Sequence, residues 1–128
     1  MPKAIFLMKR IPGISAEQFR NHYENRHIPL AMKYIGHLLK DYRRNYPLHV
    51  IVDPAGDALD GEAAKAHCDY DCITEMWVEN VQDLEEMARI FADPAVAPIL
   101  REDEGKFLDS KSAVMIMSDE VRSELRRD

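Results

Sequence analysis

The 128-residue sequence contains no long hydrophobic run, and this absence excludes a transmembrane helix as an interpretation. A helix that spans a bilayer needs about 20 predominantly apolar residues, and the apolar run at residues 4–8 is far shorter. This run is also shorter than the roughly 7–15 apolar residues at the centre of a signal peptide. We therefore expect a cytoplasmic protein with no membrane partner.

The sequence also lacks the excess of positive charge that nucleic-acid-binding domains show. It has 17 Lys and Arg residues against 23 Asp and Glu residues, and its formal net charge is −6. The adjacent pairs Arg43-Arg44 and Arg126-Arg127 both have acidic residues close by. We interpret them as parts of a mixed-charge surface and expect no nucleic-acid partner.

Glycine and cysteine are scarce, which argues against several classes of cofactor. The five glycines are scattered, so there is no glycine-rich phosphate loop, and no Gly-x-Ser-x-Gly nucleophile motif occurs. Cys68 and Cys72 lack zinc or redox spacing, and on one strand they would lie roughly 13 Å apart, beyond disulfide reach. His22, His27 and His67 also lack the spacing of metal ligands. We expect no metal and no cofactor.

Hydrophobic and turn signals predict a strand, a helix, two strands, a helix and a strand. In order, they are expected at residues 4–9, 16–27, 38–46, 70–78, 81–91 and 112–118. Asn80 is the expected N-cap of the second helix, with Asp83 at its third position. Asp93-Pro94 should restart a helical turn.

The first helix has clear start and stop signals. Ser15, with Gln18 three residues later, forms the pattern of a capping box. Pro29 disfavours helical geometry at the preceding residue, so the helix should end near His27. His22 lies five residues before His27 and should face solvent. The stripe that faces the core consists of Ala16, Phe19, Tyr23 and His27.

We interpret residues 1–118 as one domain and residues 119–128 as a charged C-terminal tail. A long connection at residues 47–67 is rich in turn-forming residues, with a short strand expected at 50–52 and a helical turn at 62–66. A connection of this length in a small domain is often a lid or a binding loop. A plain surface insertion is the alternative.

This order of elements predicts an α+β, ferredoxin-like split βαβ fold (β-α-β-β-α-β) with both helices on one face of the sheet. The other face would be uncovered and apolar, because both alternating sets of residues in the first strand are hydrophobic. Such a face favours pairing, and a second copy placed sheet against sheet closes a two-fold interface. We therefore expect a homodimer.

Four motifs resemble the EthD-domain proteins. They are MKRIPGISAEQF at residues 8–19, HYENRHIP at 22–29, YD at 70–71 with EMW at 75–77, and DEGKFLD at 103–109. The resemblance implies the dimeric α/β-barrel fold, in which two four-stranded sheets enclose a barrel and each subunit has a pocket between sheet and helices. It also implies a small hydrophobic or aromatic ligand and no bound metal or nucleotide.

The candidate catalytic residues are His27, Tyr23 and Glu75. The family motif has a histidine at the position of His27, and imidazole exchanges protons near neutral pH. The alternative for His27 is a structural role at the end of the helix. Tyr23, one turn earlier, would help by hydrogen bonding, or would only pack against the sheet. Glu75 would orient His27, or would form an ion pair with Arg10 or Arg43.

The candidate substrate-binding residues are Tyr42, Tyr46, Trp77, Phe107 and Asp109. The two tyrosines lie on one face of the second predicted strand and Trp77 lies on the third, so packing is the alternative for them. Asp109 has the alternative role of pinning the last loop.

With the resemblance, these residues favour a cofactor-independent enzyme that uses acid–base chemistry on an aromatic, lactone or polyketide-type metabolite. Isomerisation, cyclisation, dehydration and decarboxylation share proton transfer at a carbon next to a carbonyl. A non-catalytic binding protein and a cofactor-free monooxygenase are the alternatives.

Overall fold

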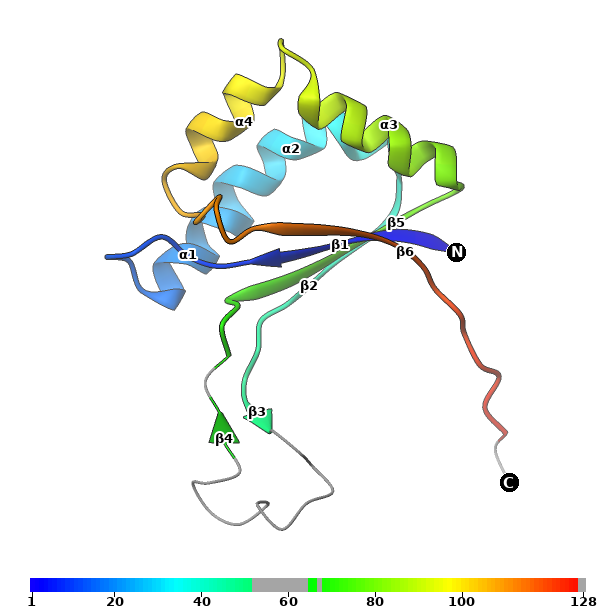
Figure 1. Cartoon of the computed structure of the whole chain (residues 1–128), viewed down its shortest axis with the longest axis horizontal. Helices are drawn as coiled ribbons and strands as arrows, with labels where there is room; N and C mark the ends of the chain where they lie inside the picture. Colours follow the sequence, from blue (N-terminus) through cyan, green and yellow to red (C-terminus); the bar gives the residue numbers. More distant parts are fainter. Residues whose placement is uncertain (52–64, 67, 127–128) are drawn as a thin grey trace.

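Four antiparallel strands form the main sheet, in the order β2-β5-β1-β6 (Figure 1). They are β1 (Pro2–Met8), β2 (Leu39–Asn45), β5 (Cys72–Val78) and β6 (Val114–Asp119). β1 pairs with β5 and β6, and β5 also pairs with β2. This computed structural model describes residues 1–51, 65–66 and 68–126. The predicted α+β ferredoxin-like fold is confirmed.

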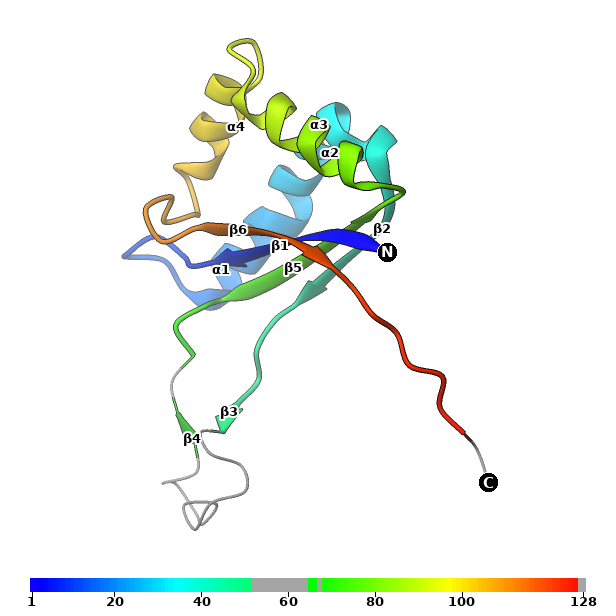
Figure 2. The same cartoon turned by 45° about the vertical axis from the view of Figure 1, so that its right-hand side comes forward.

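The helices all cover one face of this sheet (Figures 1 and 2). The first helical segment consists of α1 (Ala16–His22), a π-helical turn η1 (Tyr23–His27), α2 (Ile28–Ile35) and a short 3-10 turn η2 (Gly36–Leu38). The second consists of α3 (Val81–Ala92) and α4 (Ala97–Glu104). Within the described residues, no helix has the length and hydrophobicity needed to cross a membrane.

The prediction that the first helix ends near His27 is wrong, because the π-helical turn carries the segment past Pro29. The N–H of Ile28 donates to the carbonyl of Tyr23, five residues earlier. Pro29 therefore lies in the first turn of a new α-helix. A proline is tolerated in the first turn of an α-helix, where its fixed φ suits the helix.

The alternation of side chains along β5 separates the two faces of the sheet. Cys72, Thr74, Met76 and Val78 are buried under the helices. Ile73, Glu75 and Trp77 lie on the opposite face, which we call the open face because none of the helices in the described part of the chain covers it (Figure 1). The core is therefore a single layer between sheet and helices, with Phe19, Ile35, Met87 and Phe107 fully buried in it.

The long connection contains a two-stranded hairpin, β3 (Val50–Ile51) and β4 (Lys65–Ala66). The strand predicted at residues 50–52 is present at 50–51, and residue 52 lies outside the described residues. The helical turn predicted at 62–66 is wrong at Lys65–Ala66, which form a strand, and residues 62–64 lie outside the described residues. The turn expected to restart at Asp93-Pro94 is present: the Asp93 carbonyl accepts hydrogen bonds from the N–H groups of Val96 and Ala97 at 2.9 and 2.8 Å, and the turn leads into α4.

The reciprocal cap at the start of α3 gives a test of this local structure. The Asn80 side chain accepts a hydrogen bond from the Asp83 N–H at 3.0 Å, and the Asp83 carboxylate accepts one from the Asn80 N–H at 3.3 Å. Asn80→Ala should therefore lower the free energy of unfolding by about 1 kcal/mol in urea denaturation. Asn25→Ala, which removes an exposed side chain bonded only to Asn21, is the control and should change it by less than about 0.5 kcal/mol. Equal losses in the two variants would contradict the capping role.

Candidate functional site

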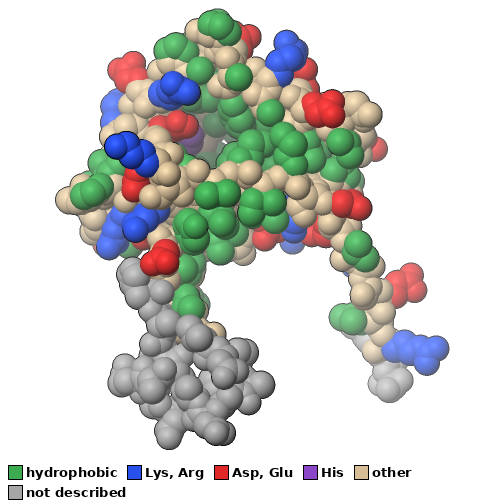
Figure 3. Space-filling view, viewed as in Figure 1, with side chains coloured by type: hydrophobic (Ala, Val, Ile, Leu, Met, Phe, Trp, Pro, Cys, Tyr) green, Lys and Arg blue, Asp and Glu red, His purple; other side chains and the backbone are tan. Residues whose placement is uncertain are grey.

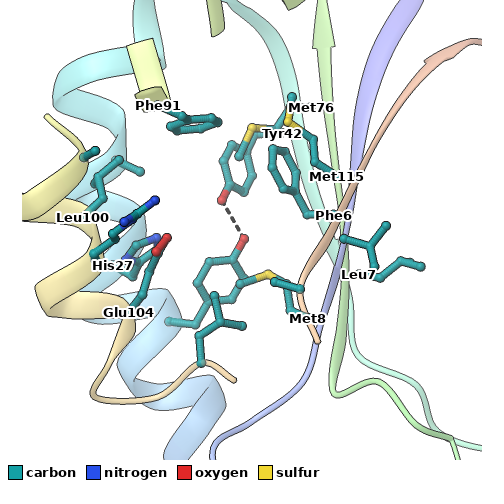
Figure 4. Close-up of a pocket in the computed structure, with 17 residues that line it drawn as sticks. Phe6, Leu7, Met8, His27, Tyr42, Met76, Phe91, Leu100, Glu104 and Met115 are labelled. Carbon is teal, nitrogen blue, oxygen red and sulfur yellow. Dashed lines mark hydrogen bonds between the residues drawn. The ribbon is translucent and has the colours of Figure 1, made fainter. Parts of the chain in front are cut away.

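A cavity of about 280 Å³ lies between the helical layer and the sheet. Its wall is mostly apolar, and Figure 3 shows its opening with histidine and acidic side chains at the wall. The polar groups that line it are Tyr23, His27, Tyr42, Arg101 and Glu104. In Figure 4, His27 and Glu104 come from the helical side, whereas Tyr42 and Met76 come from the sheet. The cavity is thus an apolar space with a few polar groups on opposite walls, as small-molecule sites usually are.

His27 is held by a carboxylate of α4. Its Nδ1–H donates to Asp103 Oδ2 at 2.9 Å, and the side chains of His27 and Asp103 are only 12% and 14% exposed. Because an ionised carboxylate only accepts hydrogen bonds, this contact fixes the proton of a neutral imidazole on Nδ1. The lone pair of the other ring nitrogen, Nε2, is then available for a ligand.

His22 shares this carboxylate, which corrects the expectation that it faces solvent. Its Nε2 lies 3.0 Å from Asp103 Oδ1, and its ring stacks on Phe107 at 4.9 Å. In an α-helix, residues five apart point about 140° away from each other. The i→i+5 hydrogen bond of the π-helical turn makes five residues close to one full turn, so His22 and His27 reach the same side.

The surroundings shift the pKa values of His27 and Glu104, both on the cavity wall, in opposite directions. Burial lowers the pKa of His27, and Asp103 partly opposes this shift by favouring the cation. Burial raises the pKa of Glu104, with Arg101 opposing the shift and Asp103 adding to it. Burial therefore favours the neutral form of both groups, the imidazole of His27 and the carboxyl of Glu104.

Two phenols meet at the cavity wall, Tyr23 from η1 and Tyr42 from β2. The Tyr23 hydroxyl lies 2.8 Å from the Tyr42 hydroxyl and 2.6 Å from Thr74 Oγ1. Burial raises the pKa of Tyr23 well above its usual value and raises the pKa of Tyr42 to about 12. Both phenols therefore stay protonated at neutral pH. If Thr74 donates to Tyr23 and Tyr23 to Tyr42, the Tyr42 hydrogen is free for an oxygen atom of a ligand.

Glu75 does not contact His27, because it belongs to the open face of the sheet. Its carboxylate pairs with Lys3 at 3.3 Å and accepts a hydrogen bond from Asn45 at 3.2 Å. The expected ion pair with Arg10 or Arg43 is not the one that forms. Asp103 occupies the orienting role that Glu75 was expected to fill.

The expected substrate-binding residues divide between the cavity and other places. Tyr42 lines the cavity, and Phe107 is buried beneath it, against Tyr23 and both histidines. Trp77 lies on the open face, where its Nε1–H donates to Glu120 at 2.8 Å. The Tyr46 hydroxyl donates to Glu24. Asp109 accepts hydrogen bonds from Lys111 and Ser112, which is the loop-pinning alternative.

The sequence interpretation missed Asp103 and Glu104 as site residues. Both belong to the last turn of α4, which was not predicted at this place, so nothing positioned them relative to His27. The available signal was the adjacent acidic pair at the start of the DEGKFLD motif. Over residues 1–51, 65–66 and 68–126, no group of three or more His, Cys, Asp or Glu side chains is arranged to hold a metal ion.

Replacing the shared carboxylate should change the titration of His27 in a defined direction. In Asp103→Asn the charge and acceptor that favour the imidazolium are lost, so the pKa of His27 should fall further below its ordinary value. The measurement is an NMR titration of the imidazole C2 protons, assigned with a His27→Gln variant. Glu102→Gln, which removes an exposed charge one residue earlier, is the matched control and should leave this pKa nearly unchanged.

On acidification, Asp103→Asn should lose more of its free energy of unfolding than the wild type does, because the pKa of its His27 is lowered further. The folded chain binds a proton at His27 more weakly than the unfolded chain does, because the pKa is lowered on folding. The contribution of neutral His27 to stability is therefore full above about pH 6.5 and is lost as the pH falls through the lowered pKa. An unchanged or raised His27 pKa in Asp103→Asn would contradict the orienting role of the carboxylate.

Comparison with solved structures identifies the same fold in several proteins. An EthD-like protein from Ralstonia eutropha matches with a TM-score of 0.63 and 12% identity, covering 96% of this chain and 95% of its own. An EthD family protein from Bacillus halodurans matches with a TM-score of 0.58 and 19% identity, covering 94% of this chain and 100% of its own.

A third structure is a dimeric protein of unknown function with a ferredoxin-like fold, from Bacteroides fragilis. It matches with a TM-score of 0.52 and 12% identity, covering 92% of this chain and 94% of its own. The comparison with curated proteins finds no match. The family model that describes the EthD domain matches residues 11–111, which is most of the chain, and the protein therefore belongs to the EthD-domain family.

Proposed function

We propose that the protein is a cofactor-independent enzyme that moves protons on a small apolar or aromatic metabolite bound in the cavity of about 280 Å³. The observation that carries this proposal is the half-enclosed His27, which is bound to Asp103 through Nδ1 and lines an otherwise apolar wall. A buried histidine with an oriented tautomer and an accessible second nitrogen is a typical general base.

His27 Nε2 takes a proton from a carbon next to a carbonyl group of the ligand. The carbonyl oxygen accepts a hydrogen bond from the Tyr42 hydroxyl, which stabilises the negative charge that develops there. Tyr23 supports this hydroxyl through the contact of 2.8 Å. Glu104, whose pKa is raised by burial, returns a proton to another position of the ligand or to its leaving group. Isomerisation, cyclisation and dehydration use such transfers, whereas in decarboxylation the loss of CO2 replaces the removal of the proton and only the protonation step is shared.

The apolar wall supports a planar, conjugated ligand of the aromatic, lactone or polyketide type. Its sheet side carries the thioethers of Met8, Met76 and Met115, and Phe91 closes the helical side. Thioether sulfur atoms make favourable contacts with aromatic rings. The five polar side chains can bind one or two oxygen atoms of a ligand, but they are too few to bind a highly charged molecule.

We also propose that the chain forms a homodimer through the open face. Ile5, Leu7, Ile73, Val114 and Ile116 share this face, and the last two are 41% and 42% exposed. An apolar sheet face of this kind favours pairing with a second copy. The protein of the same fold from Bacteroides fragilis is described as dimeric, which supports a dimer as the oligomeric state.

A substitution at His27 tests the catalytic proposal. A ligand is first found by screening aromatic ketones, lactones and polyketide-type compounds for turnover by the wild-type protein. His27→Gln keeps hydrogen-bonding capacity but cannot exchange protons, so kcat should fall by about 10²–10⁴-fold with little change in ligand affinity.

The control is His37→Gln, at an exposed histidine outside the cavity, which should retain full activity. Circular dichroism and the melting temperature check that both variants stay folded. Undiminished turnover in His27→Gln would contradict acid–base chemistry at this residue. Ligand binding without turnover by the wild type would favour the non-catalytic binding protein.

A further inference from the structure

The most exposed large apolar side chains of the described chain lie on two segments that leave the body of the protein. Leu48, Val121 and Leu125 are 90%, 88% and 86% exposed, whereas the next, Val81, is 56% exposed. Leu48 lies on the hairpin arm, which we define as residues 46–51 and 65–66. Val121 and Leu125 lie on the tail arm, residues 120–126. Single exposed apolar side chains are ordinary at a protein surface, so their meaning depends on where these three lie relative to the apolar open face.

The topology of the sheet places the two arms around the open face. The hairpin arm continues from β2 and the tail arm continues from β6, and these are the two edge strands of the sheet. Figures 1 and 2 show that both arms extend on the side opposite the helices. A body seated on the open face would therefore lie between the arms and contact both.

The direction of the tail arm is fixed at its base. Glu120 accepts hydrogen bonds from Trp77 Nε1 at 2.8 Å and from Lys3 Nζ at 2.9 Å, and both donors belong to the open face. The Lys3 ammonium also lies 4.9 Å above the Trp77 ring. These contacts hold the first residue of the arm against the open face, so the residues after it leave from the edge of this face.

The charges of the open face are already matched within the chain, which favours an apolar, self-complementary partner over a highly charged one. Lys3 pairs with Glu75 and Glu120, and Arg43 pairs with Asp41. The apolar strip that runs beside them is the surface proposed above for the homodimer. A second copy of the chain offers the same matched charges and the same apolar strip.

We propose that the hairpin arm and the tail arm of each chain clasp a second copy of the chain, with Leu48, Val121 and Leu125 buried against the partner. This inference rests on the homodimer proposed above and extends its interface from the sheet to the two arms. Two-fold symmetry makes each of these side chains act twice in the dimer, so a single substitution removes two contacts.

The test is a measurement of the dimer dissociation constant by sedimentation equilibrium. In the wild type, the mass at micromolar concentration should be about twice the chain mass of 14.8 kDa. Val121→Asp combined with Leu125→Asp removes four apolar contacts per dimer, so the dissociation constant should rise at least about 100-fold. Leu48→Asp, made separately, should raise it by about tenfold or more.

The matched control is Val81→Asp combined with Ile99→Asp. These residues are 56% and 43% exposed but lie on the helical layer, away from the open face. The control should change the dissociation constant by less than about threefold. Fluorescence of Trp77, the single tryptophan of the chain, gives a second readout because this residue lies on the open face.

The outcomes separate the two proposals. A dimeric wild type whose dissociation constant is unaffected by the arm variants would overturn the clasp and leave the sheet-to-sheet dimer standing. A wild type that stays monomeric at micromolar concentration would overturn the dimer and the clasp with it. The monomer of the tail variant could also melt at a lower temperature than the wild-type monomer. This result would show that the tail packs on its own chain, and it would also overturn the clasp.

Discussion

The carboxylate of Asp103 is the contact on which the candidate site depends. It joins α4 to the first helical segment and binds one nitrogen of each of two histidines. Without this contact, neither the position nor the tautomer of His27 would be defined. Partly buried carboxylates of this kind need hydrogen-bond partners, and here the two imidazoles provide them. The same interaction therefore supports the packing of α4 and the chemistry of the cavity.

The fold was accessible from the sequence because strand alternation, capping residues and turn signals agree with one another. Ser15 and Asn80 cap the two helices as expected, and both capping boxes form. The face of β5 that meets the helices was harder to assign. Both alternating sets of this strand contain apolar residues, so alternation alone did not show that Glu75 points away from His27. The set of β5 side chains that the helices cover becomes the buried one, and the helix positions are not contained in the strand pattern.

The site required information that periodicity does not contain. A helical pattern read at 3.6 residues per turn separates His22 from His27, whereas the π-helical turn, with its i→i+5 hydrogen bonding, brings them to one side. π-helical turns are frequent at functional sites, and this one places Tyr23 and His27, both on the cavity wall, at its two ends. The family motif made His27 a candidate in the sequence, but the sequence did not indicate which carboxylate binds it.

The thioether side chains that line the sheet side of the cavity have a consequence for ligand selection. Met8, Met76 and Met115 bound the cavity there. Unbranched methionine side chains change rotamer more easily than aromatic or β-branched ones, so this boundary adjusts to the shape of the occupant. For the proposed ligands, shape discrimination would then be weak on the sheet side, and the fixed polar groups around His27 would set where their oxygen atoms lie. The proposal therefore expects tolerance of a range of ring systems.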